Sequence, residues 1–116
     1  MPQRATSTVT LQVLQATTTT EITSATRAVV YLNKAGLATA VVDVNVTSFE
    51  PKGTISVIAS TGEACSGTVS PATGDGGCKL EFSTTGTRTV TASYSGDGNH
   101  LPSNSSNQVT VVVNPY

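Results

Sequence analysis

Residues 37–48 carry the most regular pattern of the chain, an alternation of apolar and polar side chains. A period of two places successive side chains on opposite faces of a β-strand, so that one set meets the core and the other meets solvent. We therefore predict a long strand here, at the centre of a sheet. Its inward face comprises Ala38, Ala40, Val42, Val44 and Val46, and its outward face Asp43, Asn45 and Thr47.

Shorter segments with the same period lie on both sides of this strand. They are predicted as strands over residues 17–24, 28–32, 54–60, 65–70, 78–82, 86–94 and 107–114. Turn-forming residues separate them, and residues 71–77 hold so much glycine that we expect a loop without structure of its own. No segment has a helical period. Seven to eight short strands predict an all-β fold, namely a Greek-key β-sandwich.

Composition limits the partners that such a domain can have. The 116 residues suffice for one domain with a single core. Only 11% of them are charged and the net charge is −1, so no basic cluster can neutralise phosphates, and we expect no nucleic-acid partner. No apolar run approaches the roughly 18 residues of a membrane-spanning helix, so we expect no membrane insertion. The first residues lack the apolar segment of a signal peptide, so either the signal lies further upstream in a longer protein or the chain is cytosolic.

Two cysteines, Cys65 and Cys78, stand 13 positions apart. This spacing is not the Cys-x-x-Cys of a zinc or redox site, and no further Cys accompanies the pair. Two interpretations remain, a disulfide between neighbouring strands and a pair of buried free thiols. We favour the disulfide, which would stabilise the fold by about 3 kcal/mol and would indicate an oxidising compartment.

The chain offers few groups for catalysis or metal binding. Its single histidine, His100, falls in a turn, where we expect a solvated side chain, and no nucleophile elbow occurs. Asp97, Asn99 and Asp75 could supply oxygen ligands to calcium. A calcium site needs six or more such ligands, however, and Asp-Gly-Asn is first of all a turn sequence. We therefore expect no catalytic residue, no cofactor and no metal site.

Residues 86–99 read Gly-Thr-Arg-Thr-Val-Thr-Ala-Ser-Tyr-Ser-Gly-Asp-Gly-Asn, one alternating strand followed by a sharp turn. This stretch resembles the signature of the bacterial immunoglobulin-like domains of group-three type, which occur as repeats in large extracellular proteins. Pro51 with Gly53, and the threonine run that opens the first strand, match the family as well. The resemblance covers residues 17–113 and implies an immunoglobulin-like sandwich located outside a bacterial cell. Tyr94 either bonds its hydroxyl to nearby backbone or fills the core in place of an absent tryptophan.

A second similarity lies between the two ends of the chain. Residues 109–113 (Val-Thr-Val-Val-Val) match residues 9–13 (Val-Thr-Leu-Gln-Val) at an offset of 100, about the length of one immunoglobulin-like domain. The match indicates that residues 1–15 are the terminal strand of a preceding repeat, or a strand-exchange arm, and that residues 16–116 form the domain. Chance similarity between two valine-rich strands is the alternative.

Two functions are compatible with these observations. The first is a non-catalytic spacer or stalk repeat of a bacterial cell-surface or secreted protein such as an adhesin, with neighbouring repeats as its partners. The second is a self-assembling or ligand-binding module in which residues 8–13 add to a sheet edge of another copy by β-augmentation. The side chains that would pair in this way are Val9, Leu11 and Val13.

Overall fold

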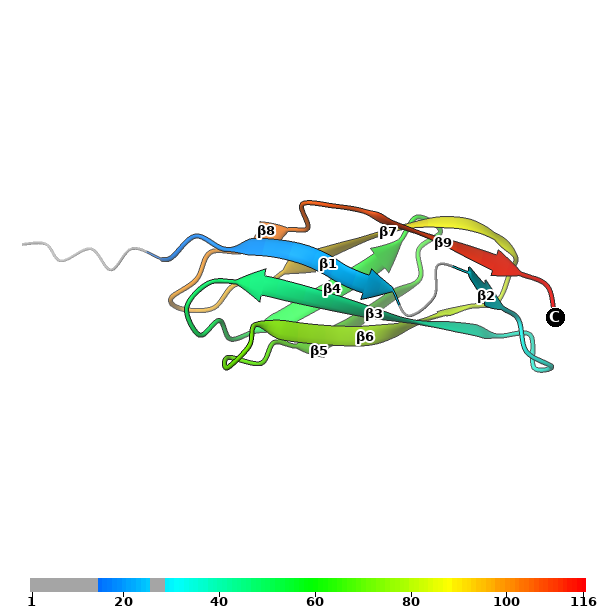
Figure 1. Cartoon of the computed structure of the whole chain (residues 1–116), viewed down its shortest axis with the longest axis horizontal. Coiled ribbons are helices and arrows are strands. Elements are labelled where there is room, and N and C mark those ends of the chain that lie inside the picture. The colour runs from blue at the N-terminus through cyan, green and yellow to red at the C-terminus, as the bar shows by residue number, and fades with distance from the viewer. Residues whose placement is uncertain (1–14, 26–28) are drawn as a thin grey trace, which may run out of the picture.

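The computed structural model describes residues 15–25 and 29–116, and the regular elements in these ranges are β-strands (Figure 1). They are β1 (Thr19–Ala25), β2 (Val29–Tyr31), β3 (Ala38–Thr47), β4 (Thr54–Ala59), β5 (Ala64–Thr68), β6 (Asp75–Phe82), β7 (Gly86–Tyr94), β8 (Ser103–Asn104) and β9 (Val109–Asn114). For the described residues, the prediction of an all-β fold is confirmed.

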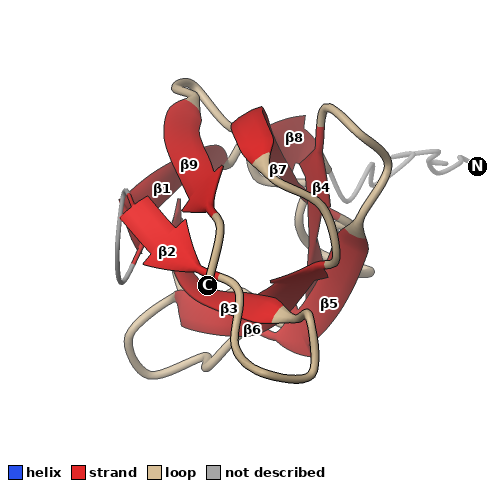
Figure 2. Ribbon diagram, turned by 90° about the vertical axis from the view of Figure 1, so that its right-hand side faces the viewer, coloured by secondary structure: helices blue, strands red, loops and turns tan. Residues whose placement is uncertain are grey.

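The strands form two sheets. β1, β3 and β6 make a three-stranded antiparallel sheet with β3 in its centre, as the alternation predicted. The other sheet has the order β2-β9-β7-β4-β5, with the short β8 paired to β7. Its pairs are antiparallel apart from β2, which runs parallel to β9 at the sheet edge. Figure 2 shows the strands of the two sheets arranged around a shared interior.

The inward faces of both sheets fill this interior, which makes the arrangement sandwich-like. On β3, buried and more exposed positions alternate, and Val42 and Val44 have no exposed surface. Ile55 and Val57 of β4 and Val90 of β7 are fully buried in the same cluster. Burial of each such side chain contributes about 1.5–3 kcal/mol, so this common core holds the two sheets together.

The glycine-rich segment before Cys78 is partly strand, and the expectation of an unstructured loop there is wrong. β6 begins at Asp75, and its two glycines pair with β3. Their backbone is in close contact with the other sheet, because a Cβ added to Gly67 of β5 would lie only 2.2 Å from the carbonyl oxygen of Gly77. Glycine inside a strand often marks such a close approach. Glycine content alone does not distinguish this contact from a turn.

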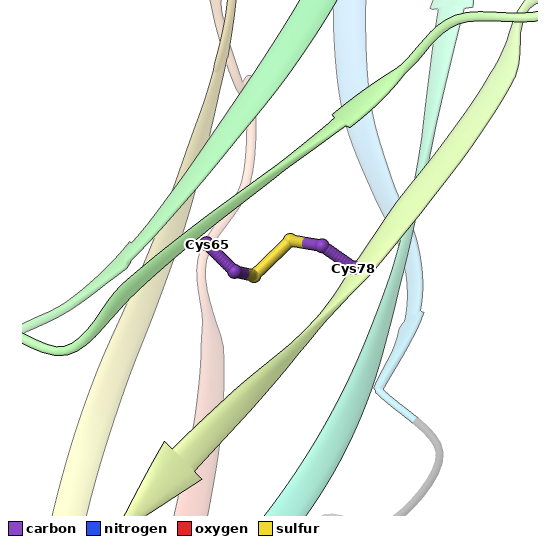
Figure 3. Close-up of a disulfide and its surroundings, with 2 residues drawn as sticks. All are labelled: Cys65 and Cys78. Carbon is purple, nitrogen blue, oxygen red and sulfur yellow. A yellow bond between two sulfur atoms is a disulfide. The ribbon is translucent and has the colours of Figure 1, made fainter.

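The two cysteines lie beside this contact, Cys65 on β5 and Cys78 on β6 (Figure 3). They form a disulfide, and their Cα atoms are 5.9 Å apart. β5 belongs to the six-stranded sheet and β6 to the three-stranded sheet. The disulfide therefore joins the two sheets along one side of the sandwich, rather than two hydrogen-bonded neighbours within one sheet.

The segment between β8 and β9 closes the other side of the sandwich. The backbone N–H of Ile22 donates to Oδ1 of Asn107, and Nδ2 of Asn107 donates to the Ile22 carbonyl oxygen, both at 2.9 Å. On the same strand, the hydroxyl of the buried Thr20 lies 2.7 Å from the hydroxyl of Ser103. Together with one backbone hydrogen bond, from the N–H of Ser106 to the carbonyl oxygen of Thr20 at 2.9 Å, these side chains connect β1 to the six-stranded sheet without a continuous backbone ladder.

Val9, Leu11 and Val13, the residues predicted to pair with a sheet edge, lie outside the described residues. Their pairing stays a prediction, and so does the division of the chain into residues 1–15 and 16–116.

Candidate functional site

The described chain begins and ends at opposite ends of the domain (Figure 1). At the N-terminal end, the first described residues are hydrogen-bonded to the turn that follows β7. The N–H of Ala16 donates to the carbonyl oxygen of Asn99, and the N–H of Leu101 donates to the carbonyl oxygen of Ala16, both at 2.8 Å. We define the linker clamp as Gln15, Ala16, residues 96–101 of this turn, and residues 49–52 between β3 and β4.

Asp97 is the centre of the linker clamp. Its Oδ1 accepts a hydrogen bond from the N–H of Asn99 at 2.7 Å, and its Oδ2 accepts one from the N–H of Lys52 at 2.9 Å. Because Lys52 belongs to the turn between β3 and β4, one carboxylate joins two turns that are far apart in the sequence. The carbonyl oxygen of Asp97 also accepts a hydrogen bond from Nε2 of Gln15 at 3.0 Å, which attaches the incoming chain to the same residue.

His100 completes the linker clamp, and the expectation of a solvated side chain is wrong. The residue is only 6% exposed. Its Nδ1 lies 2.8 Å from Oδ1 of Asp97, and its Nε2 lies 2.7 Å from the carbonyl oxygen of Phe49. Both neighbours are acceptors, so both ring nitrogens can donate only in the protonated imidazolium. Local sequence could not reveal this setting because Phe49 lies 51 positions away.

These contacts change the ionisation of both side chains. Hydrogen bonds to the Asp97 carboxylate and to the Phe49 carbonyl raise the pKa of His100 above 6.5. Burial alone would raise the pKa of Asp97, but the hydrogen bonds from His100 and from two backbone amides outweigh it and lower that pKa from 3.8 to about 2. Asp97 is therefore ionised and His100 is biased toward imidazolium.

This ionisation state limits what the pair can do chemically. A general base needs a free lone pair within reach of the proton that it removes. The imidazolium donates to a carboxylate on one side and to a carbonyl on the other, so it has no such lone pair. The arrangement joins two turns to the incoming chain, and it is better suited to holding backbone than to moving protons.

The three residues considered as calcium ligands are used in other ways. Asp75 lies at the start of β6, where its Oδ1 accepts a hydrogen bond from Nδ2 of Asn45 at 2.9 Å. Asn99 contributes its backbone N–H and carbonyl to the linker clamp, and the oxygens of Asp97 accept N–H donors. Within residues 15–25 and 29–116, no three or more His, Cys, Asp or Glu side chains are grouped so that they could hold a metal ion.

Tyr94 combines the two roles that its position in the sequence left open. Its ring is buried, and its hydroxyl donates to the carbonyl oxygen of Lys52, in the turn that Asp97 also binds. Burial raises the pKa of this hydroxyl.

Gly53, in the same turn, has a φ of 112°, and a Cβ there would lie 2.7 Å from the backbone oxygen of Gly96. The Pro-x-Gly and Gly-Asp segments of the sequence therefore meet in one contact.

Phe49 gives the linker clamp an exposed apolar surface. Its side chain is 81% exposed, although its carbonyl is held by His100. It lines an open cavity of about 350 Å³ together with Ala16 and His100. The next residue, Glu50, has a φ of 48°, in a region that side chains other than glycine seldom adopt. The turn therefore has a defined shape and presents an aromatic ring beside the incoming chain.

A second buried charge, which the sequence analysis missed, lies near the start of β7. Arg88 is 2% exposed, and its Nη2 donates to the carbonyl oxygen and to the hydroxyl of Thr84, at 2.8 and 2.7 Å. The guanidinium stands 5.2 Å from the ring centroid of Phe82, while Nε has no hydrogen-bond partner among the described residues. The sequence did indicate this burial, because the period of two places Arg88 on the same inward face of the strand as Val90.

Comparison with protein-family models, with curated proteins and with solved structures finds no match for this chain. In the part of the chain that the structure describes, no helix has the length and hydropathy needed to cross a membrane. The function therefore has to be inferred from the fold and from the linker clamp.

Proposed function

We propose that this chain is a non-catalytic spacer repeat of a bacterial cell-surface or secreted protein such as an adhesin. The main support is that the chain enters at one end of the domain, under the linker clamp, and leaves at the other end (Figure 1). A domain with its two connections at opposite ends lengthens a multidomain chain along one direction. This is the geometry that a stalk requires.

The strand order supports an immunoglobulin-like Greek-key arrangement for the proposed repeat. In immunoglobulin-like domains, the first, second and fifth strands share one sheet, and the third, sixth and seventh share the other. Here β1, β3 and β6 form one sheet, and β4, β7 and β9 lie side by side in the other. β2 and β5 are the edge strands of the larger sheet. The resemblance of residues 86–99 to the bacterial immunoglobulin-like signature points in the same direction.

The linker clamp supports a stiff connection to whatever precedes the domain. Ala16 is bonded through both its N–H and its carbonyl, and the hydroxyl of Thr18 donates to the carbonyl oxygen of Leu101 at 2.8 Å. The incoming chain is therefore anchored before the first strand begins at Thr19. A preceding domain that ended close to Ala16 would have only a short free connection and could not swing freely.

The disulfide supports a location outside the reducing cytosol. Cys65 and Cys78 are bonded, and stable disulfides persist mainly in secreted and cell-surface proteins. The proposed location can be tested by alkylating the thiols of the protein immediately after cell lysis. Both thiols should resist the reagent until a reductant is added. Alkylation without reductant would contradict the proposed location.

The spacer function can be tested with a two-copy chain in which residues 17–116 are repeated directly after Tyr116. Small-angle X-ray scattering should show a monomer whose largest dimension exceeds that of the single chain by about the length of one domain. The single chain, measured at the same concentrations, is the control. A compact two-copy chain, or association that grows with concentration, would contradict the proposal.

A further inference from the structure

Several large apolar side chains are exposed at the two ends of the described domain, while Ile58, 51% exposed, lies on β4 between them. Phe49 is 81% exposed and Leu101 38% exposed, and both belong to the linker clamp. At the opposite end, Tyr31, Leu37 and Tyr116 are exposed by 58%, 38% and 79%. Exposed apolar patches mark sites of interaction more often than single scattered side chains do. Packing of the core does not account for the exposed apolar side chains at the two ends.

The N-terminal end presents its aromatic ring on a fixed backbone. The carbonyl of Phe49 accepts a hydrogen bond from His100, and the following turn is held by Asp97 through the N–H of Lys52. Because this turn is already fixed, its backbone would lose little conformational entropy when a partner covers the Phe49 ring. Preorganised contacts of this kind bind more favourably than those that must first be ordered.

The C-terminal end presents Tyr31 in an equally defined position. β2 pairs with β9, where Tyr31 stands opposite Asn114, and the N–H of Leu32 donates to the carbonyl oxygen of Asn114 at 2.9 Å. The exposed tyrosine therefore stands beside the last residue of the last strand. Figure 1 shows β2 and the C-terminus close together at this end of the molecule.

In a tandem array with the offset of 100 residues, the length of the connection would bring the two ends into contact. At the offset of 100 residues, Tyr116 of one copy occupies the position that Ala16 holds at the start of the next copy. Ala16 is fixed by the linker clamp through its backbone, and Asn114 is fixed by β2. In such an array only Pro115 would lie between these two anchored positions. Two residues span at most about 7 Å, which leaves no room for solvent-filled space between the end faces.

We propose that successive copies of this domain stack end to end, with Phe49 of one copy packed against Tyr31 of the copy before it. This inference rests on the proposed spacer function and names its partner, a second copy of the same domain. The exposed Glu50 follows Phe49 and can face the exposed Lys34 in the turn after β2, although the exposed Lys52 lies two residues after Glu50. Opposite charges across an interface favour one orientation of the partners.

The stacking can be tested in the two-copy chain, because that chain contains each end face in a paired and in an unpaired form. Phe49→Ala in the second copy removes a ring from the junction, while Phe49→Ala in the first copy changes a face with no copy before it. For Tyr31 the two copies exchange roles. Tyr31→Ala in the first copy alters the junction, and Tyr31→Ala in the second copy alters a face with no copy after it. Thermal unfolding of each variant verifies that both domains still fold.

The measurement is the rotational correlation time from NMR relaxation of backbone amides. A stacked pair tumbles as one body, so either junction substitution should lower the correlation time toward that of a single domain. The matched substitutions at the outer faces should leave it unchanged. Equal effects of Phe49→Ala in the two copies would overturn the proposed contact.

Failure of the stacking and failure of the spacer function give different results. If the unaltered two-copy chain is an extended monomer whose domains tumble independently, the stacking is wrong and the spacer function stands. If the two-copy chain is a compact monomer, the spacer function is wrong and the stacking fails with it.

Discussion

Asp97 and His100 lie three positions apart in the turn after β7, with Nδ1 of His100 2.8 Å from Oδ1 of Asp97. Each of them also binds the turn between β3 and β4. Asp97 accepts from the N–H of Lys52, and His100 donates to the carbonyl of Phe49. The two contacts span 45 and 51 positions of the sequence, respectively. One charged pair thus connects two distant turns and fixes the point at which the chain enters the domain.

The stability of the domain should depend on pH through this pair. The pKa of His100 in the folded state is raised above 6.5, so its contribution is complete below pH 6.5 and is lost as pH rises through the raised value. The pKa of Asp97 is lowered from 3.8 to about 2, so its contribution is complete above pH 3.8 and is lost as pH falls through about 2. The contribution of the pair should therefore be greatest between pH 3.8 and 6.5.

Thermal unfolding followed by circular dichroism, at pH values below and above 6.5, measures the effect of His100. His100→Gln removes the titrating group, so the variant should lose the decline in unfolding midpoint that we expect for the unaltered protein as pH rises above 6.5. An unchanged decline in His100→Gln would assign the pH dependence to another group.

Asp97→Ala should loosen the linker clamp while the core stays folded. The substitution removes the acceptor for three N–H donors, so the N–H groups of Ala16 and Leu101 should exchange with deuterium faster. Asp75→Ala is the matched control, because that carboxylate binds Asn45 and makes no contact with Ala16. Similar exchange at Ala16 in both variants would show that Asp97 does not hold the incoming chain.

Loss of the disulfide should destabilise the domain by about 3 kcal/mol, the value that chain entropy gives for a closed loop of this size. Cys65→Ser with Cys78→Ser removes the bond without leaving a free thiol. Urea unfolding of this variant and of the unaltered protein, each with and without reductant, measures the difference. The reductant should destabilise only the unaltered protein. Equal stability of the variant and the unaltered protein in the absence of reductant would contradict the prediction.

Gly67→Ala should destabilise the domain more than a typical surface substitution does. Its Cβ would lie 2.2 Å from the carbonyl oxygen of Gly77, so β5 and β6 would have to move apart, at a cost of about 1–3 kcal/mol or more. Gly98→Ala is the control, because a Cβ there meets nothing within 4 Å and the φ is not in the left-handed region. Chemical denaturation of both variants should separate them. Equal stability would mean that the two sheets can separate at this point without loss.

Asn107→Ala should weaken the opposite side of the sandwich. The substitution leaves the N–H and carbonyl of Ile22 without the partners that the Asn107 amide provides, which costs about 1–3 kcal/mol. Asn104→Ala changes an exposed amide in β8 and should have little effect. The free energies of unfolding in urea test the difference, and a neutral Asn107→Ala would show that water replaces these bonds.

The period-two pattern predicted most of the strands and their buried faces, but it missed β8 and the first residues of β6. Ile22, Ile55, Val57, Leu80 and Val90 all lie in the core, where their alternation with polar neighbours placed them. Strand periodicity is local, because it follows from the pleat of a few consecutive residues. The same rule applied to Arg88 would have predicted its burial, but charged side chains are rarely expected inside, so the signal was not used.

The candidate site was less predictable. Sequence analysis found Asp97, Asn99 and His100 in one turn and interpreted them as turn residues or as weak calcium candidates. It did not find their connection to Lys52 and Phe49, because nothing near residue 97 in the sequence indicates which distant turn will lie beside it.

The sequence by itself determined where most of the strands form, which faces they bury and where most turns lie, because these follow from side-chain periodicity and from the steric limits of single residues. Tertiary structure alone decided the roles of the polar and small residues. His100 is buried because two turns meet, Asn107 replaces a strand ladder because β1 lies beside it, and Gly67 allows two sheets to touch. Each role depends on a contact between residues far apart in the chain, and such contacts exist only after the sheets have packed.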